Sequence, residues 1–446
     1  MNGGHAACGP PEYGTAVSDP QTKADTLADG WKHILQGEPS ATGAIDNVCH
    51  WMDQHDGDDV THLATAAIIT KGTVAEALRA CKPSKACGPD RLANDWYRDY
   101  SDLLVPDLTR LYRLWYTEQV FLEAFLQATI FCLKKSGAGS NPCNYRPLAL
   151  LNTDYKILTR LLTTQLRRTL ACRVSKFQNG FVPGRQIHST LDYPMAARSN
   201  AHMSPEARDA LALLRDFAMA YDSLDRRFLY AVLRRHGYPM HFIQVVERLH
   251  SGTTVRFLAN GASSEPVLVT RGIRQGCPLA PLIFILALEP LYQRIQSGMV
   301  VEGVALRTAA ATVIIGVAGY ADDTAVYLSS PEELPAAFRT IDFFGSASGL
   351  NLNRYKTIAV ELHPDGLREA ATWTSHIRLL GLTESCRYLG IQDGTQTDAL
   401  RSSHLAEEQL RTRLRLASQP TLTIGQRSRV AAAGIIPKLL FIDRHA

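Results

Sequence analysis

The most constraining feature of the sequence is a pair of adjacent aspartates between two apolar segments. Apolar residues run up to Tyr320, Asp322 and Asp323 follow, and a second apolar segment extends from Ala325 to Leu328. This pattern predicts two strands joined by a tight turn, with both acids at the tip. Adjacent carboxylates repel each other and favour a bound cation. Aspartate is also common in turns, so the pair alone fits an ordinary polar hairpin as well.

A site that holds two metal ions needs a third carboxylate, and Asp216 is the candidate. It belongs to an apolar run, Leu211 to Phe217, that predicts a short buried strand. If that strand lies beside the Asp322 hairpin in one sheet, the acids meet at one edge. Oxygen ligands of this kind suit two Mg²⁺ ions, with Mn²⁺ as an alternative. Asp222 is a rival ligand, but its place before a predicted helix, which Ser223 would cap, favours a structural role.

Charge is spread unevenly along the chain. Residues 1–60 contain ten acidic residues and two lysines, a net charge of −8, whereas the whole chain carries +4. The remainder therefore carries +12. A basic body of this kind suits binding to a polyanion, and a solvated protein surface explains the charge equally well.

The sequence also bears on the compartment. The N-terminus has no secretory signal, and no run of about 18 apolar residues indicates a membrane helix. The nine cysteines are scattered, and no pair has the spacing of a zinc site. We therefore expect an intracellular protein, in the nucleus or the cytoplasm, that has no membrane contact.

One predicted helix carries positive charge along a flank. It runs from Asn152, a good N-cap residue, to about residue 170. At about 100° per residue, Lys156, Arg160 and Arg167 fall together on one side of its apolar stripe. This flank is a candidate nucleic-acid contact, although a solvated helix face would have the same pattern.

Taken in order, these segments resemble the reverse transcriptases of non-LTR (LINE-type) retrotransposons. Residues 215–223 (RDFAMAYDS) are similar to motif A of that family, residues 274–281 (RQGCPLAP) to motif B and residues 319–323 (GYADD) to motif C. Further matching segments are residues 87–90, 144–148, 155–157, 178–185, 349–353, 356–357 and 388–391. The resemblance extends over about residues 82–440.

The resemblance implies roles for single residues. Asp216 and Asp322 would be the principal metal ligands, with Asp323 close by. Tyr221 would crowd the sugar 2′ carbon and exclude ribonucleotides, unless it is a core aromatic residue. Lys356 would donate a proton to pyrophosphate, unless it is an ordinary surface lysine. The residues implied to contact the incoming nucleotide are Phe217, Tyr221, Gln275, Gly276, Arg146 and Arg185.

The same resemblance implies an α+β right-hand polymerase fold, with fingers and palm, an antiparallel palm sheet flanked by helices, and a partial helical thumb. Outside the resemblance, the composition of residues 1–75 predicts an acidic, loosely ordered leader with one or two weak helices. Residues 76–205 would form the fingers, 206–395 the palm and 396–446 the start of a truncated thumb. In the thumb, Arg411, Arg413 and Arg415 would grip the nucleic-acid backbone.

The expected activity is RNA-directed DNA polymerisation, in which a nucleotide passes from a dNTP to the 3′ hydroxyl of a DNA primer on an RNA template. The segment before residue 82 is too short for an endonuclease, so we expect a separate nicking activity to be needed. Two alternatives stay open: a truncated, catalytically incompetent copy that only binds RNA, and a maturase-like reverse transcriptase.

Overall fold

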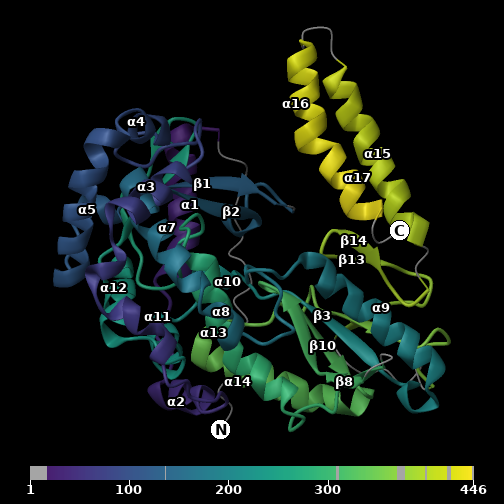
Figure 1. The fold of residues 1–446 in the computed structure, drawn as a ribbon. Coiled ribbons are helices and arrows are strands. Elements are labelled where there is room, and N and C mark those ends of the chain that lie inside the picture. The colour runs from purple at the N-terminus through teal and green to yellow at the C-terminus, as the bar shows by residue number, and fades with distance from the viewer. Residues whose placement is uncertain are drawn as a thin grey trace. The chain divides into compact units, whose positions relative to one another are not determined.

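The computed structural model describes residues 18–135, 137–307, 311–368, 377–396, 399–418 and 423–443. The chain divides into two compact units, each assembled from separate stretches of sequence. The first unit contains residues 1–185, 217–294 and 339–352, and the second contains residues 186–216, 295–338 and 353–446. Both combine helices with β-sheet (Figure 1), which is the mixed α and β architecture that the sequence predicts.

The first unit is mainly helical. Its helices are α1 (Pro20–Leu35), α2 (Thr42–Cys49), η1 (Asp58–Ala64), η2 (Ala66–Ile68), α3 (Lys71–Arg79), α4 (Asn94–Asp99), α5 (Ser101–Glu118), α6 (Glu123–Leu126), η3 (Pro142–Asn144), α7 (Thr153–Arg167), α8 (Leu170–Arg173), α10 (Ala220–Ser223), α11 (Arg226–Arg235), α12 (Met240–His250) and most of α13 (Ala280–Gln296). Its strands are β1 (Ala128–Lys134), β2 (Tyr145–Leu151), β4 (Thr254–Ala259), β5 (Ala262–Ser263) and β6 (Val267–Leu268).

A mixed sheet and a buried helix organise this unit. The strand order is β2-β1-β4-β5, with β6 also paired to β4. β1 is antiparallel to β2 and parallel to β4. Residues Leu282 to Leu288 of α13 are all buried, as expected for a helix that is apolar on every side.

Residues 20–49, where the sequence predicts one or two weak helices, form α1 and α2. The α1 helix begins after Asp19, whose side chain accepts a hydrogen bond from the Thr22 backbone, and has Pro20 in its first turn. It packs against β4 and β5. Trp31 of α1 is almost fully buried, and its indole N–H donates to the Pro142 carbonyl over 3.2 Å. This acidic segment therefore contributes to the core of the first unit.

Of two expected helix caps, Asn152 has the predicted position and Ser223 is wrong. Asn152 stands at the N-cap of α7, but its side chain makes no capping bond and instead joins the Asp90 N–H to the Ala124 carbonyl. Ser223 does not cap the following helix. Its cap is Asp225, whose carboxylate accepts two backbone N–H bonds from the first turn of α11. The Asn152 side chain bonds to segments distant in the sequence, and Asp225 takes the cap in place of Ser223. Neither choice is visible in the local sequence.

The second unit contains most of the β-structure after residue 185. Its strands are β3 (Leu211–Arg215), β7 (Val304–Arg307), β8 (Thr312–Ile315), β9 (Val317–Tyr320), β10 (Asp323–Leu328), β11 (Ile358–Glu361), β12 (Arg378–Leu379), β13 (Cys386–Tyr388) and β14 (Ile391–Asp393). Its helices are α9 (Ile187–Met203), η4 (Pro205–Ala207), η5 (Pro331–Glu333), the start of α14 (Leu334–Ser348), α15 (Ala399–Ala417), α16 (Ile424–Gly434) and α17 (Ile436–Asp443).

The main sheet of the second unit has the order β12-β11-β3-β10-β9. The central strand β3 is antiparallel to both β10 and β11, and all five of its residues are buried. The expected antiparallel sheet is therefore confirmed for four strands, whereas the edge strand β12 runs parallel to β11. The ends of β3 and β10 are the part of the fold that positions the candidate site.

Helices complete the second unit. The α9 helix packs against β7 and β9, and α15, α16 and α17 form a separate small bundle (Figure 1). None of the helices in the described ranges combines the length and the apolar character needed to cross a bilayer.

Candidate active site

The three aspartates singled out in the sequence lie at one edge of the second-unit sheet. Thr324 of β10 pairs with Arg215 of β3, so the next cross-strand positions are Asp323 and Asp216. Residues directly opposite each other on antiparallel strands project from the same face. Asp322 occupies the turn that joins β9 to β10. The register therefore places the three acids at neighbouring positions of one sheet.

The turn itself is short and strained. Asp323 pairs with Tyr320, which leaves only Ala321 and Asp322 between the two strands. Ala321 has φ of +60°, a left-handed conformation that side chains with a Cβ atom rarely adopt. Such strain persists where the surrounding structure imposes it, and here the two flanking strands fix the ends of the turn.

Electrostatics show that the three carboxylates influence one another. The pKa of Asp323 is raised to about 6, first by burial and then by the negative charges of Asp322 and Asp216, while Arg387 opposes the shift. Asp323 is exposed as a residue, although neighbouring atoms crowd its carboxyl group. A cation bound at this edge would relieve the repulsion.

Lys356 supplies one positive charge at this edge. Ile358 of β11 pairs with Leu214, and continuing that register by two residues places Lys356 opposite Asp216. The Lys356 Nζ atom lies 3.0 Å from Oδ2 of Asp216. The Asn353 N–H also donates to the Asp216 carbonyl over 2.9 Å, which fixes the backbone there. Both side chains remain partly open to solvent, so the ion pair is an exchangeable contact of modest strength.

Further predicted residues lie in the first unit, in the glycine-bounded loop of residues 272–276. The Ile273 N–H donates to the Tyr221 carbonyl over 2.7 Å, and the Gly272 N–H donates to the Leu224 carbonyl over 2.9 Å. The Arg271 side chain, just before the loop, donates to the Ser223 carbonyl over 2.6 Å. The part of motif A after Asp216 is thereby tied to the segment that leads into motif B.

Two glycines permit this close approach. Gly272 has φ of +76°, and a Cβ atom added to it would lie 2.5 Å from the Asp222 carbonyl oxygen. Gly276 has φ of +110°, and its Cβ atom would lie 2.6 Å from the Ala149 carbonyl oxygen. The Ala149 N–H in turn donates to the Gln275 carbonyl over 2.9 Å. Residues with a side chain at either glycine would force these segments apart.

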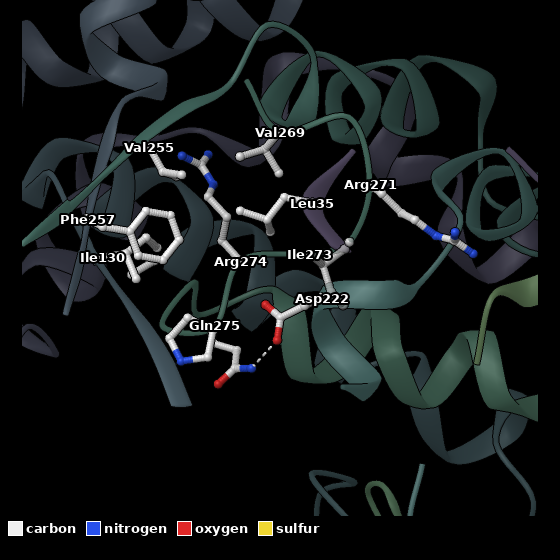
Figure 2. A pocket seen from close by; sticks show the side chains of 13 residues that line it. Leu35, Ile130, Asp222, Val255, Phe257, Val269, Arg271, Ile273, Arg274 and Gln275 are labelled. Atoms are coloured by element: carbon white, nitrogen blue, oxygen red, sulfur yellow. Dashed lines mark hydrogen bonds between the residues drawn. The ribbon is translucent and has the colours of Figure 1, made fainter. Parts of the chain in front are cut away.

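Beside this loop lies a small pocket, and the buried carboxylate of Asp222 is part of its lining (Figure 2). Asp222 Oδ2 accepts a hydrogen bond from Nε2 of Gln275 over 2.6 Å. Burial raises the pKa of Asp222 to about 7, while the Gln275 bond and the charge of Lys135 act in the opposite direction. Sequence reasoning gave Asp222 a structural role but missed its partner, because nothing near either residue marks the pairing.

The aromatic residues of motif A are held differently. The ring of Tyr221 stacks on Phe284 of α13, with centroids 4.6 Å apart and planes inclined by 18°. Phe284 was not singled out in the sequence. Phe217 is almost fully buried and forms a β-bridge with Leu352. A nucleotide contact made by Phe217 would therefore have to come from its backbone.

The two predicted nucleotide-binding arginines differ in their contacts. Arg146 is exposed on β2. The Arg185 guanidinium donates to the carbonyls of Ser175, over 2.5 Å, and Gln178, over 2.7 Å, and so stabilises the loop after α8. The exposed Arg146 side chain can contact a phosphate group of a ligand, whereas the Arg185 side chain stabilises its own loop.

The predicted nucleic-acid contacts on α7 are less exposed than a solvated flank would be. Lys156 and Arg160 are half-buried, and only Arg167 is exposed. Burial lowers the pKa of Lys156, and the charge of Asp90 partly offsets this effect.

The predicted contacts on α15 are all exposed. Arg411 pairs with Glu407, and Arg413 donates to the Gly434 carbonyl over 2.6 Å. Arg415 is exposed on the same helix. These side chains present positive charge to solvent within the second unit.

Comparison with known proteins gives the family. The model of the family described as "Reverse transcriptase (RNA-dependent DNA polymerase)" matches residues 133–393. This span includes the three aspartates, Lys356 and the loop of residues 272–276.

Curated relatives are proteins of transposable elements. The transposon TX1 uncharacterized 149 kDa protein of Xenopus laevis is 24% identical over 83% of this chain and 28% of its own length. The Pol polyprotein from the type-2 retrotransposable element R2DM of Drosophila melanogaster is 26% identical over 70% of this chain and 29% of its own. A Popillia japonica R2 polyprotein is 23% identical over 52% of this chain and 32% of its own.

The chain spans less than a third of the length of each of these relatives. Their names agree with the family model, and the residues that carry the match include the acids gathered at the edge of the second-unit sheet. The chain therefore belongs to the reverse transcriptase family, and its relatives are proteins of transposable elements.

Proposed function

We propose that the chain catalyses RNA-templated DNA synthesis at the carboxylate edge formed by Asp216, Asp322 and Asp323. The observation that supports this most directly is the register of the second-unit sheet, which makes Asp323 and Asp216 cross-strand neighbours beside the Asp322 turn. The raised pKa of Asp323 adds that these acids repel one another in the absence of a cation.

Reverse transcriptases use divalent metal ions, and we propose that two Mg²⁺ ions, or Mn²⁺ in their place, bind these three acids. In the described ranges no group of three or more His, Cys, Asp or Glu residues is arranged so that it could hold a metal ion. Mg²⁺ sites of this class use one or two carboxylates and complete their coordination with water and substrate phosphates, so a preformed cage is not required. Ions bound there would activate the primer 3′ hydroxyl and offset the charge on the leaving pyrophosphate.

Lys356 has two successive tasks in this proposal. Before substrate binds, its ammonium group offsets the charge of Asp216 at 3.0 Å. Once the ions compensate the carboxylates, the Lys356 Nζ atom is released to donate a proton to an oxygen of the departing pyrophosphate. An exchangeable surface ion pair suits such a change of partner.

The loop of residues 272–276 and the neighbouring part of motif A would bind the nucleotide. Gly276 allows close packing against Ala149, which holds the loop in place, and Gln275 would offer its side-chain amide. The ring of Tyr221, held flat against Phe284, would exclude the 2′ hydroxyl of a ribonucleotide. Arg146 would contact phosphate, while Arg185 would act indirectly by shaping its loop.

In the polymerase description, residues 76–205 correspond to fingers, 206–395 to the palm and 396–446 to the beginning of a thumb. We propose that Arg411, Arg413 and Arg415 contact the backbone of the primer–template duplex, and that Lys156, Arg160 and Arg167 make weaker contacts. Such contacts depend on charge and are weakened by salt. An endonuclease that supplies the primer end would be a separate activity.

The test is primer extension on an RNA template with Mg²⁺ and dNTPs. We compare the unsubstituted chain, Asp322→Asn and the control Asp107→Asn, which removes a charge from a solvated ion pair on α5. Extension by the chain and the control, but not by Asp322→Asn, is the expected result. Equal extension by all three would overturn the assignment of the site.

Because the chain spans under a third of its relatives, the RNA-binding alternative is tested alongside. The same three proteins are assayed for retention of labelled primer–template in a gel-shift experiment. Retention without extension by any of them would favour a protein that binds RNA but does not polymerise.

A further inference from the structure

We propose that Asp222 is a positioning residue that holds the Gln275 amide in one orientation, so that the loop of residues 272–276 presents a hydrogen-bond acceptor to the incoming nucleotide. The inference rests on the proposed function, since it deepens the role of Gln275 in nucleotide binding. It concerns the first unit alone and does not involve the metal ligands.

The chemistry of the contact determines the orientation. An ionised carboxylate can only accept hydrogen bonds, so the atom of Gln275 that faces Asp222 at 2.6 Å must be Nε2. The amide oxygen then points away from Asp222, as Figure 2 shows. Without such a partner, a glutamine amide can turn over and exchange donor for acceptor at little cost.

The backbone around the pair is fixed, which leaves the amide rotation as the main freedom. The segment that carries Asp222 is tied to the loop through Ile273 and Tyr221, and Gln275 is tied to β2 through Ala149. The steric limits at Gly272 and Gly276 hold the same segments at close distance. Asp222 therefore acts on the Gln275 side chain, whose backbone is held in place.

In the described part of the chain, Gln275 is the side chain that donates a hydrogen bond to the Asp222 carboxylate. Arg271 donates instead to the Ser223 carbonyl, and Arg274 donates to backbone carbonyls of Leu126 and Leu249. Both arginines line the same pocket without pairing with the acid. The hydrogen bond from Gln275 thus stabilises the buried Asp222 carboxylate. Without it, the ionised carboxylate would lower the stability of the folded state.

The charged and titratable groups near Asp222 come from several elements. Lys135, just beyond β1, favours the ionised form of Asp222, and the Cys132 thiol of β1 has its own pKa raised by burial. Arg271 and Arg274 belong to the pocket wall. Burial outweighs Lys135, and the pKa of Asp222 is raised to about 7. Below that pH the acid becomes a donor, and the amide can turn its oxygen toward it.

The experiment uses steady-state primer extension by the full chain, with dNTP concentration and pH as variables. The variants are Asp222→Asn, which keeps the size but can donate or accept, Gln275→Met, which removes the amide, and the double variant. Asp222→Asn should raise KM for dNTP about three- to tenfold, with a smaller change in kcat, the scale of one hydrogen bond. Thermal unfolding of each variant confirms that it folds.

The double variant separates positioning from a purely structural role. If Asp222 acts through Gln275, the double variant should have the KM of Gln275→Met alone, whereas independent effects would multiply. The unsubstituted chain should show KM rising as pH falls through about 7, and Gln275→Met should lack this dependence. Multiplying effects, or the same pH dependence in both proteins, would overturn the inference.

A second readout does not require turnover. A primer that ends in a dideoxynucleotide cannot be extended, so dNTP binding is measured as a dNTP-dependent stabilised complex in a gel shift with Mg²⁺. Complex formation that is identical for the unsubstituted chain and Asp222→Asn would overturn this inference alone. No extension and no dNTP-dependent complex with the unsubstituted chain would overturn the proposed function, and this inference with it.

Discussion

Asp323 in the second unit and Asp222 in the first both have a raised pKa, about 6 and about 7, but for different reasons. Asp323 is exposed as a residue and is surrounded by other acids, Asp322 and Asp216. Asp222 is buried, with one hydrogen bond from Gln275. The Asp323 carboxylate faces other acids, whereas the Asp222 carboxylate accepts a hydrogen bond from within the protein. In our proposals, the raised pKa therefore accompanies a binding site in one case and a positioning contact in the other.

The largest expected effect is that of removing one acid from the cluster of Asp216, Asp322 and Asp323. Asp216→Asn should reduce primer extension by roughly a thousandfold or more, the scale of losing an essential catalytic group. The same substitution removes a negative charge next to Asp323, so thermal stability should be unchanged or higher. Activity comes from primer-extension rates and stability from thermal unfolding. A large loss of stability together with activity would show that Asp216 mainly holds the sheet together.

The next effect concerns the rigidity around Asp222. Gly276→Ala should destabilise the chain by on the order of 1–3 kcal/mol, because alanine is strained at this φ and its Cβ atom would meet the Ala149 carbonyl. Gly425→Ala in α16 is the matched control, since its Cβ atom meets nothing within 4 Å. Urea unfolding measures both. Equal stabilities would mean that the loop shifts freely to make room.

Glu289 of α13 is a second buried acid to compare with Asp222. Like Asp222 it accepts hydrogen bonds from the protein, but it lies outside the loop of residues 272–276. It accepts bonds from the Ser175 N–H and from Gln293, and burial raises its pKa from 4.5 to about 7. The folded state therefore holds more protons than the unfolded state between these pH values, and stability falls as pH rises through this window. Above pH 7, ionised Glu289 lowers the free energy of unfolding by on the order of 3 kcal/mol.

Glu289→Gln removes this titration. The stability of the variant relative to the unsubstituted chain should rise between about pH 4.5 and pH 7 and stay level above it. Chemical unfolding at a series of pH values gives the slope. Parallel stability curves for the two proteins would show that Glu289 has an ordinary pKa in the folded chain.

The smallest effect concerns the ring that lies against Tyr221. Phe284→Leu should lower discrimination between dNTP and rNTP by about two- to tenfold, because an aromatic pair contributes about 0.5–1.5 kcal/mol. Phe344→Leu is the control, since Phe344 is equally buried but packs on Phe228. The ratio of kcat/KM for the two nucleotides is the measurement. An unchanged ratio in Phe284→Leu would show that Tyr221 holds its position without the stack.

The carboxylate edge could be predicted from the sequence because its determinants are local. Apolar segments on both sides of Asp322 and Asp323 fix the hairpin, and the apolar run that carries Asp216 fixes a buried strand. The pairing of those strands followed from the need for a third acid. The edge strand β12 and its parallel direction were not predicted, because two residues give too little pattern.

Side-chain partners could not be predicted in the same way. Arg185 bonds to carbonyls of its own loop, Asn152 bridges two other segments, and Asp222 pairs with a residue 53 positions away. Each is a polar residue of a suitable type for the expected role. Which hydrogen bonds it makes depends on tertiary distances that no local pattern encodes.

The two-residue turn between β9 and β10 has a consequence for sequence drift in this centre. Strand side chains alternate between faces, so adding or deleting one residue between Asp323 and Thr324 would invert which face every later residue of β10 occupies. Length changes before β9 would leave that alternation untouched. Substitutions around the acids leave this alternation intact and can accumulate. Insertions and deletions inside the hairpin should be removed by selection from elements that remain active.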